Sequence, residues 1–146
     1  MSAANGEPNE AQLKCVLADD NEAVLLALEG LLRVEGINVL GAANTGVAAL
    51  ALLRRHLANA LVLDARLPDI SGLEVARRAV ELARKHPAIV FYTSYADSAF
   101  VADALEAGAR AVVLKDAPPE NLLDALAHVE RGEVYIDPRI RRRAPR

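Results

Sequence analysis

The chain has 146 residues, which is enough for one domain with a hydrophobic core and too few for two domains of ordinary size. Hydrophobic residues make up 53% and charged residues 25%, whereas aromatic residues reach only 3% and Trp is absent, which argues against surfaces that stack on sugars or bases. The formal net charge of -3 gives no general attraction to nucleic acid, although Arg residues gather in 139–146.

The cysteine content and the start of the chain bear on the compartment. Cys15 has no second cysteine to pair with, so an internal disulfide is impossible and a reducing compartment is expected. Residues 1–12 are polar and lack the basic start and apolar stretch of a signal peptide. No apolar run approaches the roughly 20 residues needed to cross a bilayer. We therefore expect a cytoplasmic protein without membrane contact, in which 1–12 form a flexible tail.

Short apolar runs alternate along the chain with segments of helical periodicity. Apolar residues repeat within 22–35 at Val24, Leu28 and Leu32, and Gly36 stands where a C-terminal cap glycine belongs. Two prolines at 118–119 favour the first turn of a last helix. In chain order the predicted elements are strand 13–18, helix 22–35, strand 37–42, helix 45–57, strand 60–63, loop 64–71, helix 72–86, strand 88–92, helix 98–107, strand 111–114 and helix 118–131.

This alternation predicts an α/β fold. Strands separated by helices pair in parallel through right-handed crossovers, and strands this apolar need cover on both faces. The expectation is a doubly wound, five-stranded parallel sheet formed by residues 13–132, followed by 133–146 as a basic C-terminal tail or the start of a linker.

Polar residues stand where four of these strands end, and in such sheets ligands bind outside the carboxyl ends of the strands. We expect these residues to meet on one rim: Asp19, Asp20, Asp64, Thr93, Ser94, Lys115 and Asp116. Two carboxylates about 4 Å apart repel by about 4 kcal/mol at an effective dielectric constant of roughly 20, so a cation is required. Mg²⁺ suits such oxygen ligands at an open rim. With a positive charge from Lys115 and a hydroxyl from Thr93 or Ser94, the set predicts phosphoryl transfer to Asp64.

Several stretches resemble the receiver domain of two-component response regulators, over about 13–132. No single stretch is specific, but their joint order at the strand ends is. They are VLADD at 16–20, LDARLPDISG at 63–72, YTS at 92–94, and GA at 108–109 leading to LKD at 114–116. The resemblance implies a flavodoxin-like (βα)5 fold with strand order 2-1-3-4-5.

The resemblance also implies a role for each site residue. Asp64 is the phosphoacceptor, Thr93 the switch hydroxyl and Lys115 the phosphate contact. Mg²⁺ is held by Asp19, Asp20, Asp64 and the backbone carbonyl of Arg66. A histidine kinase or phosphotransfer protein donates the phosphoryl group, while the receiver itself performs the transfer and slow hydrolysis and is no dedicated enzyme. Its output reaches a downstream protein partner or a homodimer through helix 98–107, strand 111–114 and helix 118–131, and the domain itself does not bind nucleic acid.

Alternatives remain open from sequence. Residues 132–138 resemble the exit of receivers that carry a LuxR-type DNA-binding domain, so the chain is either a receiver cut from such a transcription regulator or a stand-alone receiver. A degenerate receiver would use the same surface as a constitutive protein-interaction module, and a metabolite phosphotransferase would need a closed substrate pocket. Asp19, Asp20 and Asn21 have a plainer interpretation as helix caps, and the Arg residues of 139–146 as a solvated end.

Two departures from the family pattern affect the readout and the lifetime of the signal. Many receivers carry an aromatic residue in the fifth strand, where Val112 stands in this chain. Tyr95 is expected to take over the readout, with Phe91 or Tyr92 as contributors. Arg66 and Tyr95 follow the acceptor and the switch by two residues, flank the path of an attacking water, and predict slow self-dephosphorylation.

Overall fold

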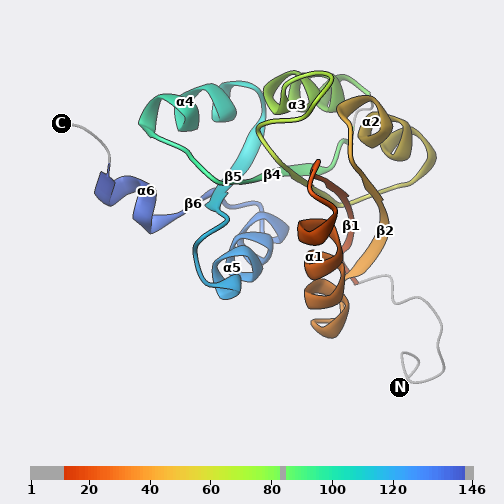
Figure 1. Cartoon of the computed structure of the whole chain (residues 1–146), viewed down its shortest axis with the longest axis horizontal. Coiled ribbons are helices and arrows are strands. Elements are labelled where there is room, and N and C mark those ends of the chain that lie inside the picture. The colour runs from red at the N-terminus through yellow and green to blue at the C-terminus, as the bar shows by residue number, and fades with distance from the viewer. Residues whose placement is uncertain (1–11, 83–84, 144–146) are drawn as a thin grey trace.

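In the computed structural model of the chain, residues 12–82 and 85–143 are described. They form one parallel sheet in the order β2-β1-β3-β4-β5-β6, with helices on both faces (Figure 1). The elements are β1 (Lys14–Ala18), α1 (Glu22–Val34), β2 (Asn38–Ala43), α2 (Gly46–Arg55), β3 (Ala60–Leu63), α3 (Gly72–Glu81), β4 (Ala88–Thr93), α4 (Ser98–Glu106), β5 (Ala109–Leu114), α5 (Pro119–Glu130), β6 (Tyr135–Ile136) and α6 (Pro138–Arg143). The doubly wound α/β fold is therefore confirmed.

The sheet separates two hydrophobic cores. Successive residues of a strand point to opposite faces, so Leu61, Leu63 and Phe91 pack beneath α2, α3 and α4, while Val62 and Val90 pack against α1 and α5. Figure 1 shows these two helical layers above and below the strands. All four residues of β3 are buried, which is why this strand reads as a continuous apolar run. The central strands are thereby held rigidly from both sides.

The helices begin directly after the loops that leave the carboxyl ends of the strands, and a polar side chain fixes each of four starts. Asn21 accepts from the amides of Ala23 and Val24, and Thr45 accepts from Ala48. Ser71 and Asp97 accept from the third residue beyond them. These caps satisfy amides that the helix leaves free, so the loops on this rim are short and well positioned.

A sixth strand corrects the five-strand expectation. Tyr135 and Ile136 pair in parallel with Ala111 and Val112 of β5. The outer edge of β5 would otherwise present unpaired amides and carbonyls, and the returning chain covers it. α6 follows, and Ile140 within it is only 2% exposed. The ordered fold thus continues past residue 132, because β6 and α6 lie in the segment that the sequence analysis expected to be a basic tail or the start of a linker. Residues 1–11 and 144–146 lie outside the described residues.

Most predicted bounds agree with the structure to within two residues, but α3 is shorter than expected. The helix ends at Glu81 rather than at residue 86. The amide of Leu82 donates to the carbonyl of Ala79, a tighter turn that is common at helix ends. Pro87 then disfavours helical backbone in the residue before it.

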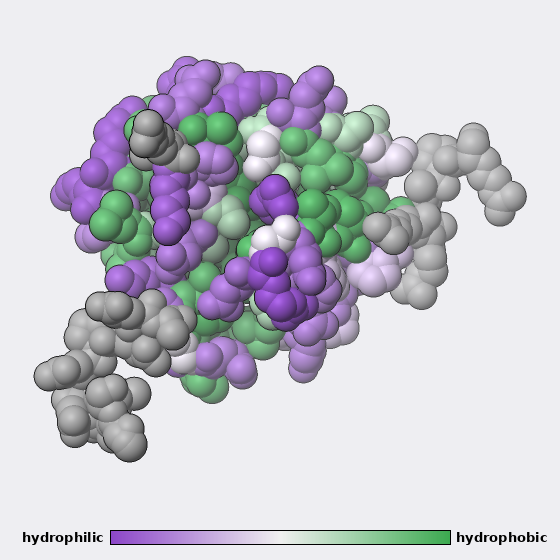
Figure 2. Space-filling model, turned by 180° about the vertical axis from the view of Figure 1, so that it is seen from behind, coloured by the Kyte–Doolittle hydropathy of each residue, from purple (hydrophilic) through white to green (hydrophobic). Residues whose placement is uncertain are grey.

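The surface mixes hydrophobic and hydrophilic residues, as the view from behind shows (Figure 2). Exposed large apolar side chains lie on different elements, among them Leu26 of α1, Leu57 after α2 and Leu105 of α4. Within 12–82 and 85–143, no helix has both the length and the apolar character needed to cross a bilayer.

Candidate functional site

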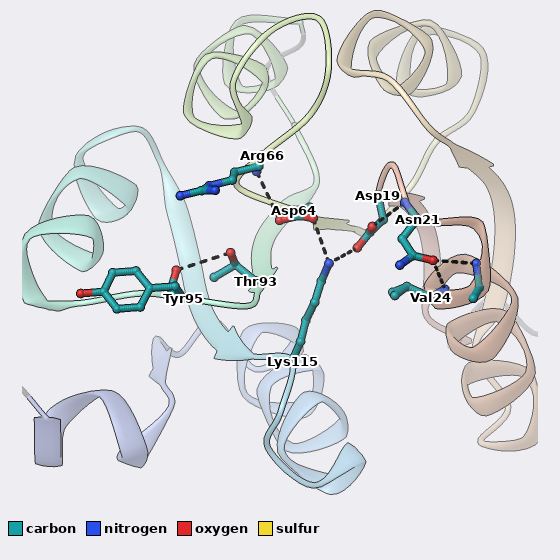
Figure 3. Close-up of polar contacts among 9 residues, drawn as sticks. Asp19, Asn21, Val24, Asp64, Arg66, Thr93, Tyr95 and Lys115 are labelled. Atoms are coloured by element: carbon teal, nitrogen blue, oxygen red, sulfur yellow. Dashed lines mark hydrogen bonds and ion pairs between the residues drawn. The ribbon is translucent and has the colours of Figure 1, made fainter.

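The carboxyl ends of β1, β3 and β5 bring three predicted site residues together. Asp19 directly follows β1, Asp64 follows β3 and Lys115 follows β5, and their side chains point toward one another (Figure 3). The backbone holds this arrangement, because the amide of Asp64 donates to the carbonyl of Ala18 at 3.0 Å and that of Asp19 to Ala43 at 3.0 Å. The site is therefore built on strand ends rather than on a long loop.

Three carboxylates form an acidic cluster at this rim. Asp19, Asp20 and Asp64 each offer an oxygen, and these oxygens lie within 4.8 Å of one another. Asp19 is 2% and Asp64 6% exposed, whereas Asp20 lies open to solvent. Two buried carboxylates and one open one form a half-exposed set of hard oxygen donors, which is the kind of site that Mg²⁺ occupies while keeping part of its water.

The N-terminus of α1 is capped by the side chain of Asn21, not by that of Asp19 or Asp20. Its side-chain oxygen accepts from Ala23 at 2.9 Å and from Val24 at 3.3 Å, so Asn21 is the residue that caps α1. Asp19 supports it through Oδ1, which accepts from the amide of Asn21 at 2.9 Å. Oδ2 of Asp19 is left facing the centre of the site, where it meets Lys115.

Lys115 supplies positive charge inside the acidic cluster. Its Nζ lies 2.6 Å from Oδ2 of Asp19 and 2.9 Å from Oδ2 of Asp64. Burial alone would lower the pKa of Lys115, but hydrogen bonds to Asp19 and then to Asp64 outweigh burial and raise the pKa above its ordinary value. One ammonium against three carboxylates leaves an excess of two negative charges, which favours a divalent cation.

Thr93 and Ser94, the two candidate hydroxyl residues, differ in burial. Thr93 ends β4 and is 3% exposed, whereas Ser94 is exposed. Oγ1 of Thr93 donates only a long bond of 3.5 Å to the carbonyl of Tyr95, and the Thr93 carbonyl accepts from the Lys115 amide at 2.8 Å. The Thr93 hydroxyl therefore lies beside Lys115 on the neighbouring strand with a weak present partner.

Arg66 lies next to the acidic cluster through its backbone. Its amide donates to Oδ1 of Asp64 at 3.2 Å, while its side chain is exposed and extends toward the side of Thr93 and Tyr95 (Figure 3). The loop that carries Arg66 is fixed by Asp69, which accepts from the amides of Gly46 and Val47 at 2.8 Å each. These two bonds tie the loop that follows β3 to the start of α2.

The aromatic residues near Thr93 differ from one another in burial and in contacts. Val112 is fully buried and pairs with Phe91 across β4 and β5. Phe91 meets Phe100 of α4 edge-on, with ring centroids 5.1 Å apart. Tyr95 is 67% exposed, and its hydroxyl reaches Asp97 only at 3.5 Å. Among the aromatic candidates, Phe91 is thus the one in ring contact with α4.

Two residues near the site, Asp137 and Arg139, were missed by the sequence analysis, which had named Tyr92 only as a contributor to the readout. Burial raises the pKa of Tyr92, while the charge of Lys115 lowers it and the charge of Asp19 raises it. Asp137 and Arg139, from the supposed tail, contact the end of β5 and Asp116. The available signal was the β-favouring run before Asp137 together with the following proline, which is typical of a strand that leads into a helix.

A separate cavity of about 460 Å³ lies at the opposite, amino ends of the strands. Leu13, His56, Asn59 and Pro87 are among its lining residues, and none of the predicted site residues lines it. The cavity is therefore not part of the site formed by Asp19, Asp64 and Lys115.

Comparison with known proteins gives the family. The chain belongs to the response regulator receiver domain family, whose sequence profile matches residues 15–127. The oxygen regulatory protein NreC of Staphylococcus carnosus is 32% identical over 130 residues, which are 88% of this chain and 59% of that protein. The transcriptional regulatory protein YhcZ of Bacillus subtilis is 34% identical over 125 residues, 85% of this chain and 58% of that protein.

Solved structures agree with the fold and with the LuxR-type subgroup. A two-component response regulator of the LuxR family from Aurantimonas sp. SI85-9A1 superposes with a TM-score of 0.84 at 28% identity, over 90% of this chain and 94% of that one. The receiver domain of the response regulator NarL from Mycobacterium tuberculosis gives 0.78 at 27% identity, over 84% of this chain and 98% of that one. The chain spans about three fifths of the length of the curated relatives that it matches. It is therefore a response-regulator receiver of two-component signalling, a signalling family and not a dedicated enzyme class.

Proposed function

We propose that Asp64 accepts a phosphoryl group and that Asp19, Asp20, Thr93 and Lys115 serve this transfer. The observation that carries the proposal is the position of the Lys115 ammonium between Oδ2 of Asp19 and Oδ2 of Asp64. A cation held there neutralises the nucleophile in the resting state and stands ready to contact the oxygens of an incoming phosphoryl group. In phosphoryl transfer, positioning and charge stabilisation are the main contributions that a protein makes.

In the transfer step, an oxygen of Asp64 forms a bond to phosphorus while the bond from phosphorus to the donor nitrogen of a phosphohistidine breaks. The nitrogen keeps the electron pair and takes up a proton, and Asp64 becomes an acyl phosphate. Lys115 compensates charge on the phosphoryl oxygens. Asp19, Asp20, Asp64 and the Arg66 carbonyl would hold Mg²⁺, which when bound supplies charge neutralisation among the carboxylates and the phosphoryl oxygens. We propose a histidine kinase or a phosphotransfer protein as the donor.

The same site supports a switch. Phosphorylation adds about 1.5 to 2 negative charges and three acceptor oxygens. To turn toward these oxygens, the Thr93 hydroxyl loses only its 3.5 Å hydrogen bond to the carbonyl of Tyr95. Tyr95 lies in the loop 94–97, which leads into α4. A shift from 1:99 to 99:1 between two states requires about 5.5 kcal/mol of differential interaction, which a few charge-assisted hydrogen bonds supply. Phe91 and Phe100 offer the path by which β4 and α4 move together.

The output is proposed from the relatives. YhcZ is named a transcriptional regulatory protein, and the chain corresponds to only part of such relatives. We propose that α4, β5 and α5 carry the signal to an output domain or a separate protein partner in the cytoplasm, with homodimer formation on this surface as one form of output. Contact with nucleic acid would belong to the output domain rather than to the receiver.

The test is incubation with acetyl phosphate and Mg²⁺ followed by intact-mass measurement. We expect a mass increase of one phosphoryl group in the wild-type chain and none in Asp64→Asn, which keeps the shape of the side chain. Asp124→Asn is the matched control, since it removes an exposed carboxylate on α5 away from the cluster. An unmodified wild-type chain would contradict the proposal and favour constitutive protein binding by a degenerate receiver.

A further inference from the structure

The segment that follows α5 is attached to both chain neighbours of Lys115. Leu114 on one side is bound by Asp137, and Asp116 on the other side is bound by Arg139. Lys115 itself is the residue that reaches the acidic cluster. A segment expected to be a tail therefore holds the piece of backbone from which the phosphate-contacting side chain extends.

Asp137 extends the sheet ladder with its own side chain. Its amide donates to the carbonyl of Val112 at 2.8 Å, and its Oδ2 accepts from the amide of Leu114 at 3.0 Å. The side chain is fully buried, and its Oδ1 accepts from the amide of Arg139 at 3.0 Å. Burying a carboxylate costs free energy unless it is hydrogen-bonded, so these bonds offset the cost of burying Asp137 and hold its side chain in one orientation.

Arg139 makes a bidentate contact, called the fork below, with Asp116, the other chain neighbour of Lys115. Its Nη1 lies 3.1 Å from Oδ1 of Asp116 and its Nη2 donates to Oδ2 at 3.1 Å. A two-point contact between guanidinium and carboxylate fixes direction as well as distance. The Arg139 side chain is 26% exposed, which limits screening by water on its side of the pair.

The opposite side of the same backbone is bound to the switch residue. The Lys115 amide donates to the carbonyl of Thr93 at 2.8 Å. The start of the β5–α5 loop is thus held from β4 through Thr93 and from the C-terminal segment through Asp137 and Arg139. Any movement of the Lys115 backbone toward a phosphoryl group must be accommodated by one of these attachments, whereas its side chain can still turn about its own bonds.

We infer that Asp137 and Arg139 are positioning residues for Lys115, so that residues 135–140 are a working part of the phosphorylation site and also report its state. The inference rests on the proposed function of Asp64. Linkage makes the effect reciprocal: if the attached segment favours the ligand-bound position of Lys115, then occupation of the site favours the attached segment. In a longer chain, the signal would leave the receiver along this segment as well as through α4.

The test uses beryllofluoride with Mg²⁺ as a phosphoryl mimic, titrated into ¹⁵N-labelled protein. We expect Arg139→Gln and Asp137→Asn to weaken apparent beryllofluoride affinity by roughly 5-fold or more. Asp137→Asn turns an acceptor oxygen into a donor that faces an amide, whereas Arg139→Gln removes a rim contact and leaves the fold intact. In the wild type, the amides of Ile136, Asp137, Arg139 and Ile140 should shift on saturation, and Arg139→Gln should reduce these shifts.

Arg110→Gln is the matched control, because Arg110 donates to the carbonyl of Gly132 at 2.8 Å and so holds the same segment at the end of β5 distant from Lys115. Restored affinity in the exchanged pair Asp116→Arg with Arg139→Asp would support positioning through the fork. Wild-type affinity in both Arg139→Gln and Asp137→Asn, with unmoved amides at positions 136, 137, 139 and 140, would overturn the inference while leaving Asp64 as the acceptor. No wild-type response, or an equal response in Asp64→Asn, would instead overturn the proposed function.

Discussion

Lys115 donates a 2.9 Å hydrogen bond to Oδ2 of Asp64, so in the resting state the proposed nucleophile already shares an oxygen with a cation. The same ammonium lies 2.6 Å from Asp19, and it therefore occupies the carboxylates that a metal ion would use. We therefore expect Lys115 and Mg²⁺ to compete for these oxygens before phosphorylation. We expect them to cooperate only when phosphoryl oxygens arrive to share the positive charge.

The first prediction follows from this competition. Lys115→Gln should raise the affinity for Mg²⁺ by about tenfold, which is about 1.4 kcal/mol, because one positive charge leaves the cluster. The same change should slow phosphorylation by acetyl phosphate. Isothermal titration with MgCl₂ measures the first effect. Lys14→Gln, at the other end of β1, is the control and should leave Mg²⁺ affinity unchanged; weaker binding in Lys115→Gln would refute the competition.

Gly72 lies against the backbone of the acceptor, and a methyl group there has no room. A Cβ on Gly72 would overlap the carbonyl oxygen of Asp64 and come within 2.8 Å of the Cα of Ala65. Because both are backbone atoms, we expect Gly72→Ala to lower the free energy of unfolding by about 2 to 4 kcal/mol. Urea unfolding measures this loss.

The control for this substitution lies within α1. A Cβ on Gly30 meets no atom within 4 Å, so Gly30→Ala should raise the free energy of unfolding by about 1 kcal/mol through helix propensity alone. Equal effects of the two substitutions would mean that the packing of Gly72 beneath Asp64 is looser than described.

The parts of the fold that sequence predicts are those where local pattern and topology agree. Asp64 follows a strand buried on both faces and precedes a capped helix, so both its location and its neighbours are fixed by nearby residues. β6 has only two residues, and its pairing with β5 depends on a contact across the chain that no local pattern encodes. Asp137 before a proline looks like an ordinary turn residue, and only the returning chain makes it a partner of Leu114.

Asp69 should give the chain a sensitivity to acid. Hydrogen bonds from the amides of Val47 and Gly46 lower the pKa of Asp69 from 3.8 to about 2. Because the folded pKa is the lower one, its stabilisation is present above the unfolded value and is lost as pH falls from about 4 to about 2. The difference in unfolding free energy between wild type and Asp69→Asn should therefore shrink over this range.

Thr45→Ala is the control for the acid experiment. Thr45 accepts from the Ala48 amide on the same helix start but carries no titrating group. Its effect on the free energy of unfolding should stay constant over this pH range. A difference for Asp69→Asn that stays equally constant would contradict the role of its two amide contacts.

The contact between Phe91 and Phe100 should carry more of the signal than Tyr95. Phe100→Leu keeps an apolar side chain but removes the edge-on ring contact, which is worth about 0.5 to 1.5 kcal/mol. We expect it to reduce the phosphorylation-dependent chemical shift changes in α4. Tyr95→Ala, at an exposed position, should alter stability by less than about 0.5 kcal/mol and leave most of these shifts. Loss of the α4 shifts in Tyr95→Ala alone would assign the readout to Tyr95.

The lifetime of the phosphorylated state should depend on Arg66 and Tyr95. The side chains of both residues are exposed at the rim, and the Arg66 side chain extends toward Thr93 and Tyr95 (Figure 3). We expect a phosphoryl group on Asp64 to face this side. An attacking water must approach phosphorus opposite the Asp64 oxygen, so bulk on this side slows hydrolysis. We expect Arg66→Ala and Tyr95→Ala each to shorten the half-life of the phosphoryl group by roughly threefold, a change of about 0.7 kcal/mol in the barrier. A time course of intact mass after removal of acetyl phosphate measures this half-life.

Arg77→Ala, which removes an exposed Arg on α3 that pairs with Glu74, should leave the half-life unchanged. A wild-type half-life of a few seconds in Mg²⁺ would show that these side chains do not shield the phosphoryl group.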